Sequence, residues 1–416
     1  MFTQEQYLVL QQSVRRLEVK IELLNTSDIV IDSFEGYSVS GSINLNSESD
    51  YRRTGSLSMV VEDSTLLPSP ESKIWFNRKV KVYIGLKNWL DEIVWFSQGI
   101  FVMQNASIED SKEGATIDIS LSDLMSLIDG KMNGNITHET KVVPEGNLIS
   151  EEIRQALSLL GKVSVDDIEI NGISAKVPYT IMISPDSTVY QYVKTLLDLY
   201  YGMEIFYNED GFLIIRKIRD RKFDPIVWDF TAEGMNLVMD SSRELDFTNV
   251  RNSIFLWGRK KDTGETIKWT YRNKYSRNTN TQMKSIVGMK NGDICHVAIE
   301  DVSYYWNESS WIKLDFTVSP EFNIESIGEK SFAHTDESIA TVEQAMLRAE
   351  FELKKRNNMA ESISFSCVPL YGMDTNEKIY MKNPKTGIEG DYLVKSISFG
   401  MNHSDTMSVQ AEKIYY

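Results

Sequence analysis

The stretch that decides the fold is QGIFVM at residues 98–103, because a similar stretch, EGDYLV, recurs at residues 389–394. Each copy places a glycine second and ends in three apolar or aromatic residues. When the two are aligned without a gap, Ala106 and Ile108 fall on Ile397 and Phe399. Alternation with a period of two is the pattern of a half-buried β-strand. The two stretches therefore predict equivalent strands in two related β regions.

The match extends outward from these stretches in the same order. After one deletion, Ile117 and Ile119 fall on Met407 and Val409. Many antiparallel β domains share alternation and glycine turns, so a chance likeness of two such domains is the alternative. The common order of the strand pairs favours a duplicated domain. The upstream matches are Asn77, Lys79, Val80 and Val82 with Asn376, Lys378, Ile379 and Met381, and Leu57, Met59 and Val61 with Ile363, Phe365 and Cys367.

The sequence pattern divides the chain into four parts. Residues 1–130 predict a mostly antiparallel β domain that begins with a short helix over residues 4–14 and ends with another over residues 121–128. Residues 131–146 are rich in Gly, Asn, Thr and Pro without periodicity, which indicates a linker. Residues 236–416 return to β signals and predict a second β domain, with one helix at residues 341–356 whose last turn is basic.

Residues 147–235 predict a small α+β insert between the two β domains. Ser150 suits the N-cap of a helix that runs to Leu160, with acidic residues in its first turn. A second helix over residues 187–201 carries apolar side chains at helical spacing. A hairpin follows at residues 203–215 and turns at Asn208-Glu209-Asp210-Gly211.

The composition excludes several classes of protein. The chain has 416 residues, of which 42% are hydrophobic and 11% aromatic, so about two to four folded domains are expected rather than a disordered polymer. Cys295 and Cys367 are isolated and offer neither a disulfide framework nor a zinc module. We find no signal-peptide pattern at the start and no apolar run long enough to span a bilayer. We therefore expect a soluble protein that is made without export and binds no membrane.

The net charge of −16 argues against broad nucleic-acid binding, which needs clustered Lys and Arg. Local basic runs do occur, but they lie beside acidic residues and lack the aromatic interleaving of a single-strand platform. We interpret them as solvated faces. These runs are Arg216, Lys217, Arg219, Arg221 and Lys222; Arg259, Lys260 and Lys261; and Lys354, Lys355 and Arg356.

Two small groups of residues invite a chemical interpretation. The neighbours Cys295 and His296 suggest thiol chemistry, but adjacent residues on a strand point to opposite faces, so Cys295 is interpreted as a small strand hydrophobe. His334 with Asp336 and Glu337 has the residue types of a metal site, although such groups are common by chance. Neither group is strong evidence for an enzyme.

Other enzymatic patterns are equally weak. The carboxylate pairs Asp166 with Asp167 and Glu321 with Glu325 have the chemistry for glycoside hydrolysis, but 60 acidic residues make such pairs expected. The sequence has no nucleophile elbow, phosphate-binding glycine loop or His-Glu-x-x-His motif. We therefore expect no enzyme, and no catalytic, cofactor-binding or metal-binding residues. Tryptophans that would suit a sugar platform are expected instead as core or interface anchors: Trp75, Trp89, Trp95, Trp306 and Trp311.

In their order along the chain, these features resemble the phage tail baseplate hub proteins, which are the trimeric hubs of contractile tails, tailocins and secretion-system spikes. The resemblance extends from about residue 13 to 415 and rests on order and pattern rather than on one diagnostic motif. The stretches that carry it are residues 13–24, residues 96–101, residues 327–345 and residues 387–399.

The resemblance implies a fold, partners and a location. The fold would be mainly β, with two antiparallel β-barrel domains of the tail-tube type and a small α+β domain. The chain would form a homotrimer that acts as a symmetry adaptor between a hexameric tail tube and a trimeric central spike. Its partners would be the tail tube protein, the spike protein, the tape measure protein and other baseplate proteins. It would be assembled in the host cytoplasm and carried in the virion baseplate.

Two alternatives remain open at the level of sequence. One is a distal tail or tail-tip protein that binds the host cell, and the other is a tail-borne cell-wall hydrolase. Under the hub reading, part of the charge of −16 lines the bore and repels passing DNA, within a screening distance of about 8–10 Å. The poorly periodic stretch Arg272 to Gly292 is the expected contact loop.

Overall fold

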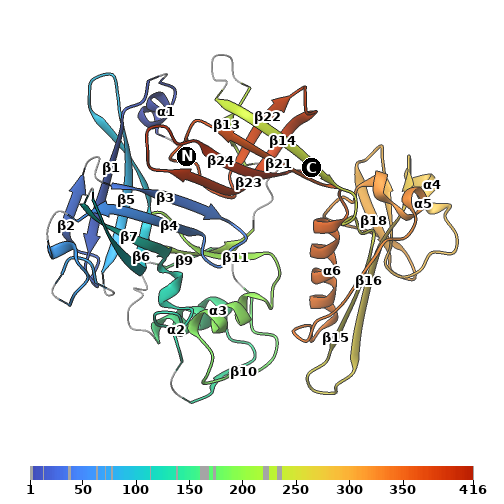
Figure 1. Ribbon diagram of the computed structural model, residues 1–416. Coiled ribbons are helices and arrows are strands. Elements are labelled where there is room, and N and C mark those ends of the chain that lie inside the picture. Colours follow the sequence, from blue (N-terminus) through green and yellow to red (C-terminus); the bar gives the residue numbers. More distant parts are fainter. Residues whose placement is uncertain are drawn as a thin grey trace.

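The computed structural model describes residues 3–12, 14–35, 39–61, 64–70, 72–75, 78–112, 114–136, 139–159, 168–171, 175–218, 224–231 and 237–415. A sheet of thirteen strands dominates it (Figure 1). The strand order is β14-β21-β24-β23-β3-β4-β7-β6-β5-β1-β2, and β22 joins β23 and carries β13 at its side. In the part that is described, this path is open at β14 and β2.

We call the two contributions to this sheet the first and second β halves. The first β half contains α1 (Gln4–Leu10), β1 (Leu17–Leu24), β2 (Val30–Glu35), β3 (Val39–Asn46), β4 (Arg53–Val60), β5 (Lys79–Lys87), β6 (Ile93–Ser111) and β7 (Gly114–Asp123). The second β half contains β13 (Ile226–Asp229), β14 (Val238–Asp246), β21 (Ala360–Cys367), β22 (Lys378–Asn383), β23 (Ile388–Gly400) and β24 (Met407–Lys413).

Two inserts interrupt the halves. The first insert contains β8 (Lys141–Val143), α2 (Ile149–Ser158), β9 (Ile168–Asn171), β10 (Ile181–Ile183), α3 (Val189–Leu197), β11 (Met203–Tyr207) and β12 (Leu213–Lys217). The second insert contains β15 (Ser253–Arg259), β16 (Thr266–Arg277), α4 (Asn280–Lys284), β17 (Asp293–Val297), β18 (Val302–Trp306), β19 (Trp311–Lys313), α5 (Ile324–Ile327), β20 (Ser331–Thr335) and α6 (Val342–Arg356). None of the described helices is long and apolar enough to cross a membrane.

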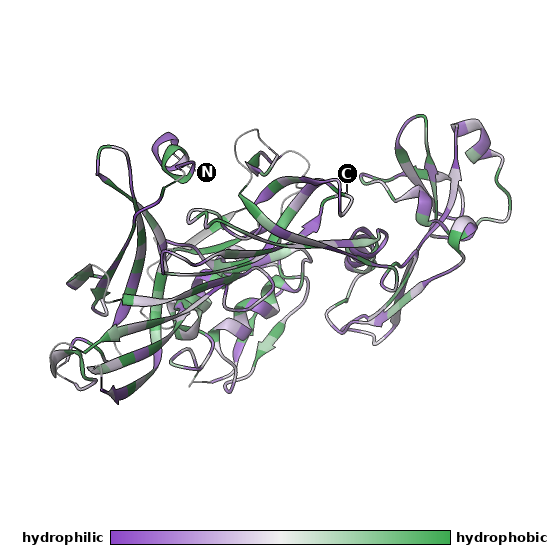
Figure 2. Ribbon diagram, turned by 45° about the horizontal axis from the view of Figure 1, so that its top comes forward, coloured by the Kyte–Doolittle hydropathy of each residue, from purple (hydrophilic) through white to green (hydrophobic). Residues whose placement is uncertain are grey.

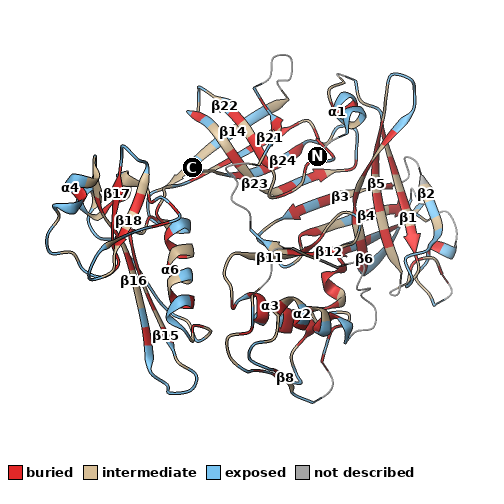
Figure 3. Cartoon of the chain, turned by 180° about the vertical axis from the view of Figure 1, so that it is seen from behind, coloured by how far each residue is buried: buried red, intermediate tan, exposed pale blue. Residues whose placement is uncertain are grey.

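One apolar core joins the two halves. The strands of the large sheet alternate between buried and exposed residues, as in β24, because one face packs inward and the other meets water. Figures 2 and 3 show this alternation along the strands. A single cluster of buried side chains runs from Leu10 and Ile21 in the first half to Tyr392 and Val409 in the second. The mainly β fold is therefore confirmed, but the halves share one sheet and one core instead of forming two separate closed barrels.

The strand pairing confirms the internal repeat. Val80 pairs with Phe101 in the first half, and Ile379 pairs with Tyr392 in the second, as the alignment from sequence requires. Gly99 and Gly390 occupy equivalent positions, with φ angles of +139° and +135°. The equivalent strands β6 and β23 also carry a bulge at the same place, between Met103 and Asn105 in one and between Val394 and Ser396 in the other. A repeated bulge is a strong sign of duplication, because bulges are retained within related folds.

One part of the sequence alignment is wrong by two residues. Leu57 pairs with Ile119, and the equivalent residue Val409 pairs with Phe365 rather than with Ile363. Leu57 therefore corresponds to Phe365. The error is invisible to hydrophobic patterning, because a shift of two residues keeps every side chain on the same face of the sheet. Asn77, the first residue of the upstream match, lies outside the described residues.

The elements of the first insert agree with the pattern in the sequence. The two expected helices are α2 and α3, and the expected hairpin is β11 with β12. The expected N-cap at Ser150 is wrong, because α2 begins at Ile149 with Leu148 as its N-cap, and Ser150 lies in the first turn of the helix. A capping box between Thr188 and Gln191 begins α3. The stretch 131–146 is more ordered than a linker, since it carries β8, which pairs with β10. At the other end, β13 begins at Ile226 and pairs with β22, so it belongs to the large sheet.

The second insert was not expected from the sequence. Residues 253–335 form their own six-stranded sheet, and α6 packs on β15 and β16 of that sheet. Its buried residues, such as Leu256, Tyr271 and Leu353, form a separate core. The stretch 236–416 thus holds two sheets rather than one β domain, and its helix covers the second insert. The long loop expected over Arg272 to Gly292 is wrong, because this stretch contains the end of β16 and all of α4, and its contact role stays a prediction.

Candidate functional site

The outward face of the large sheet is a continuous polar surface. Its side chains stand opposite one another across β6, β7, β4, β3, β23, β24, β21 and β14, for example Ser42 opposite Ser56 and Ser364 opposite Gln410. We call this surface the serine face, since serine is its commonest residue. Its members are Asn105, Ser107 and Glu109; Thr116, Asp118, Ser120 and Ser122; Thr54, Ser56, Ser58 and Val60; Ser40, Ser42, Asn44 and Asn46; Ser396, Ser398 and Gly400; Ser408, Gln410 and Glu412; Ser362, Ser364 and Ser366; and Asp240, Ser242 and Glu244.

Every charged member of the serine face is acidic. The carboxylates are Glu109, Asp118, Asp240, Glu244 and Glu412. Among the described residues, Glu412 is the one of these five that forms an ion pair: the Nζ of Lys395, at the β23 bulge, lies 3.0 Å from Glu412 and 3.4 Å from Glu48. A surface of hydroxyls with scattered carboxylates offers hydrogen bonds to water and repels phosphate. It lacks the fixed cations that hold a nucleic acid.

The two β halves meet where β3 pairs with β23. Ser396 stands opposite Asn46, and Gly400 stands opposite Ser42. The backbone adds two bonds beyond the ladder, from Ser47 N to Lys395 O at 2.9 Å and from Met401 N to Gly41 O at 3.0 Å. This antiparallel junction makes the serine face continuous across both halves.

Besides the open side of β2, two strand edges of the large sheet have no backbone partner among the described residues and lie beside the serine face. β14 ends the sheet order and pairs only with β21. β6 pairs with β5 only as far as Val102, so from Asn105 onward it pairs on one side alone, with β7. Free edges expose rows of backbone N–H and C=O groups that can add another strand.

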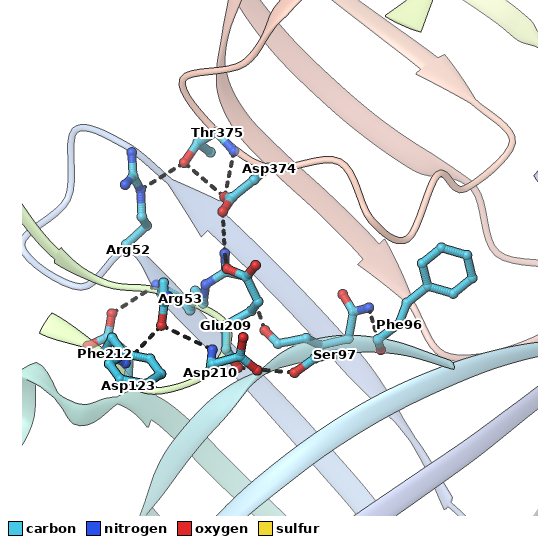
Figure 4. Close-up of polar contacts among 12 residues, drawn as sticks. Arg52, Arg53, Phe96, Ser97, Asp123, Glu209, Asp210, Phe212, Asp374 and Thr375 are labelled. Carbon is cyan, nitrogen blue, oxygen red and sulfur yellow. Dashed lines mark hydrogen bonds and ion pairs between the residues drawn. The ribbon is translucent and has the colours of Figure 1, made fainter. Parts of the chain in front are cut away.

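A buried polar junction ties the first insert to both halves. Arg53, at the start of β4, donates from Nη1 to the carbonyl oxygen of Gln98 at 3.1 Å. Its Nη2 contacts Asp374 of the second half and lies 3.6 Å from Glu209 of the first insert (Figure 4). The side chain is almost fully buried, with 4% of its area exposed. One guanidinium therefore joins three parts of the chain.

Arg52 makes a second set of contacts beside it. Its Nε donates to Thr375 Oγ1 at 2.9 Å, and its guanidinium lies 3.6 Å from the centre of the Phe206 ring. Glu204 lies 3.5 Å away and also accepts from Arg216 at 2.6 Å. The planar guanidinium can stack on a ring and form hydrogen bonds at its rim together. The junction thus fixes the hairpin β11–β12 against the large sheet.

Two carboxyl groups near the junction are held partly in their neutral form. Burial raises the pKa of Asp123 to about 6, although the backbone N–H groups of Arg53 and Met125 donate to it and oppose the shift. Burial also raises the pKa of Glu377 to about 7, against the hydrogen bond from the Asp374 backbone N–H. Both shifts follow from removing a carboxylate from water.

The Cys295 and His296 pair is part of the core of the second insert. Both lie on β17, and Cys295 is fully buried next to Tyr275 and Met283. Burial raises the pKa of its thiol to about 12, so the thiolate that a nucleophile needs is absent at neutral pH. Burial also lowers the pKa of His296. The interpretation of Cys295 as a strand hydrophobe is confirmed.

The residues proposed as a metal group serve other contacts. His334 stacks on Phe332, with 6.0 Å between ring centres. Asp336 accepts hydrogen bonds from Ser338 and, at 2.8 Å, from the hydroxyl of Tyr201, which links the two inserts. In the part of the chain that is described, no three His, Cys, Asp or Glu side chains are grouped so that they could hold a metal ion.

The other sequence candidates are dispersed. Glu325 forms an ion pair with Arg277 at 2.6 Å, whereas Asp166 and Asp167 lie outside the described residues, as do Arg219, Arg221 and Lys222. Trp306 and Trp311 pack edge to face across the β18–β19 hairpin, while Trp95 packs against Tyr83 in the large sheet. The tryptophans therefore do not form one platform. The serine face was missed, although alternate serines such as those at 362, 364 and 366 are visible in the sequence.

Comparisons with known proteins place this fold. No protein-family model matches the chain, and no curated protein matches it in sequence. Among solved structures, a tail protein from Neisseria meningitidis MC58 is similar with a TM-score of 0.56 and 9% identity, over 95% of this chain and 96% of that one. The 43 kDa tail protein of prophage MuSo2 from Shewanella oneidensis is similar with a TM-score of 0.55 and 12% identity, over 95% and 97%.

A third similar structure is a chain of a protein complex. A chain of the Francisella PdpA-VgrG complex has a TM-score of 0.51 and 9% identity, over 97% of this chain and 53% of that one. At such low identity the likeness shows the fold and not the activity. The chain has the fold of phage tail proteins, as its resemblance to baseplate hubs predicts.

Proposed function

We propose that this chain is a non-enzymatic baseplate hub of a phage or phage-like tail, a homotrimer that joins a hexameric tail tube to a trimeric central spike. The observation that carries the proposal is the duplication. Each chain holds two β halves with equivalent strands, equivalent bulges and one shared sheet. Three such chains offer six similar units to a six-fold partner while keeping three-fold symmetry elsewhere.

The inserts supply the three-fold part of this adaptor. They occur once per chain; the second insert has its own core, and the first insert packs around a cluster that also includes Val102 of β6. They therefore appear three times in a trimer, whereas the β halves appear six times. We place the tube on the side of the β halves and the spike, the tape measure protein or other baseplate proteins on surfaces that the inserts contribute.

The serine face would line the bore. Its hydroxyls and five carboxylates, Glu109, Asp118, Asp240, Glu244 and Glu412, present no strong site to DNA. DNA that passes through the bore needs a surface that makes many weak contacts and no strong ones. The net charge of −16 then acts locally, because screening confines each carboxylate to about 8–10 Å.

A cryo-electron map of the intact tail tests the proposal. We expect three copies of the chain around the axis between tube and spike, with the serine face toward the bore. Six copies in the ring, or copies only at a fibre tip, would contradict it. A zymogram of the purified protein on host cell wall tests the non-enzymatic part, since clearing would show a hydrolase.

A further inference from the structure

We propose that the outward face of the sheet in the second insert binds a carbohydrate that carries carboxylate or phosphate groups. We call this surface the aromatic face, because Phe255 and Trp257 of β15 form its centre. Two cations, Arg259 and Lys268, lie beside the rings. The aromatic face belongs to a different sheet from the serine face, so the inference goes beyond the proposed hub function and does not depend on the proposed trimer.

The two rings of the aromatic face are open to a ligand. Phe255 and Trp257 are two residues apart on a strand, so both side chains stand on one side of the sheet. Their rings are nearly parallel, with 18° between the planes and 6.4 Å between the centres. α6 packs on the opposite side, where Ile254 and Leu256 join the core. Figure 1 shows α6 between this sheet and the first insert, so the aromatic face is turned away from the first insert. Both rings are half-buried and belong to neither buried cluster of the second insert.

The charges on the aromatic face favour an anionic ligand. Every charged side chain on this side of β15, β16 and β20 is basic, in contrast to the acidic serine face. Lys268 stands directly opposite Trp257, and Arg259 is the next residue of β15 on the same side. Neither cation forms an ion pair with a described residue, whereas Arg272, at the other end of the face, lies 2.7 Å from Asp293. Cations without a carboxylate partner attract an anion, even in a chain with a net charge of −16.

The hydroxyls of the aromatic face fit a sugar. Thr270 stands opposite Phe255 on β16, and Thr335 stands beside Trp257 on β20. Each hydroxyl can donate and accept a hydrogen bond, as the hydroxyls of a sugar do. Ala333, beside Phe255, is exposed and too small to cover the ring, which can therefore pack against the C–H groups of a sugar ring.

A single-stranded nucleic acid fits the aromatic face less well. It would also stack on aromatic rings, but its backbone needs cations along the whole groove. Here Arg259 and Lys268 lie together near the turn between β15 and β16, and the middle of the face carries hydroxyls. A carbohydrate with isolated acidic groups matches this distribution of charge.

Isothermal titration calorimetry of the full chain tests the proposal. The anionic probes are hexagalacturonate and a phosphomannan hexasaccharide, and the neutral probe is maltohexaose. We expect at least one anionic probe to bind roughly tenfold more tightly than maltohexaose, with an affinity that falls as salt is added. Oligothymidylate is the nucleic-acid probe. Tighter binding of oligothymidylate than of both anionic sugars, or no binding of either sugar, would overturn the proposal.

Substitutions of an aromatic residue locate the site. Trp257→Ala should lower the affinity for the anionic sugar roughly tenfold, because it removes one of the two rings. Trp89→Ala is the matched control, since Trp89 is 84% exposed on the β5–β6 hairpin of the large sheet and should leave the affinity unchanged. Equal losses in the two variants would place binding outside the aromatic face and overturn the proposal.

A charge substitution gives a test that does not depend on a half-buried side chain. Lys268 is exposed, so Lys268→Gln keeps the fold and should lower the affinity roughly fivefold, with a weaker dependence on salt. Lys313→Gln, on β19 at the opposite edge of the same sheet, is the control and should leave the affinity unchanged. Unchanged binding by the Lys268→Gln variant would overturn the proposal. The number of subunits does not enter these measurements, so a negative result leaves the proposed hub standing.

Discussion

The two β halves build the same backbone site and fill it with opposite charges. In the first half, Arg53 on β4 neighbours Asp123 on β7. The equivalent positions in the second half hold Glu361 on β21 and Lys413 on β24, whose charged groups lie 3.2 Å apart. Arg53 reaches out of its half to Gln98 O, Asp374 and Glu209. In the first half, the residue at this duplicated position therefore joins the first half to the second half and to the first insert.

In the second half, the residue at the equivalent position holds an edge strand against its neighbour. Glu361 accepts from Arg243 of β14 at 2.8 Å and also contacts Lys413 and Tyr392. All of these partners belong to the second half, so Glu361 holds the edge strand β14 in place. The difference shows that duplication preserved the strand geometry while each copy used the buried position for a different connection.

Removing the charge at this position should give the largest difference in stability between the two halves. Arg53→Met leaves Asp374, Glu209 and the Gln98 carbonyl without their shared donor, and we expect a loss of about 3–5 kcal/mol in the free energy of unfolding. Glu361→Gln keeps the shape and leaves Arg243 and Lys413 with access to water, so we expect about 1–2 kcal/mol. Urea denaturation measures both.

Limited proteolysis separates a local from a global effect of the Arg53 variant. The first insert should become sensitive before the β halves, because Arg53 contacts Glu209 of its β11–β12 turn. Equal losses for the two variants, or no early cleavage in the first insert, would show that the two positions play the same role.

The paired glycines give the next largest effect. A Cβ added at Gly99 would lie 3.0 Å from the Phe101 ring and 3.2 Å from Arg53 Cδ, whereas one added at Gly390 would meet only Lys413 Cε, at 3.5 Å. Both substitutions are strained, because both φ angles are positive. We expect Gly99→Ala to cost about 2–3 kcal/mol and Gly390→Ala about 1–2 kcal/mol, measured by urea denaturation. Equal losses of stability in the two variants would mean that the Arg53 side chain moves aside for the new methyl group without destabilising the fold.

The repeat explains how much of this could be predicted from the sequence. The equivalence of Phe101 with Tyr392 and of Val80 with Ile379 followed from alternation around two glycines, since a period of two fixes which face each residue takes, and the strand pairing confirms it. The second insert could not be found in this way, because its strands alternate as well and local pattern does not say which sheet a strand joins. The second insert was therefore assigned to the expected second β domain.

The junction was also beyond local pattern. Arg53 and Asp374 are more than three hundred positions apart, and only the fold brings them together. The swap of Arg53 for Glu361 was hidden by the two-residue error in the alignment of β4 with β21. The serine face, in contrast, was visible as alternate serines, and its continuity needed only the strand order.

The smallest expected effect concerns the carboxyl group of Glu377. It directly precedes β22, as Arg78 precedes β5 in the first half, so this position too differs in charge between the halves. Burial raises its pKa from 4.5 to about 7, so the folded protein binds this proton more tightly than the unfolded chain does. The stability that this provides is complete below about pH 4.5 and is lost as the pH rises through 7.

A neutral side chain at position 377 removes this dependence. Glu377→Gln should raise the free energy of unfolding at pH 8 by about 1–2 kcal/mol, and the gain should fade toward pH 4.5, where the wild-type carboxyl is already protonated. Urea denaturation across this pH range measures the effect. The free energy of unfolding of this variant should still fall with pH, but less steeply, because the pKa of Asp123 is also raised by folding, to about 6. Arg78→Gln, at the equivalent position of the first half, is the matched control and should leave the pH slope unchanged. A Glu377→Gln variant with the same pH profile as wild type would show that Glu377 is ionised in the folded protein, with its pKa held down by the Asp374 backbone N–H.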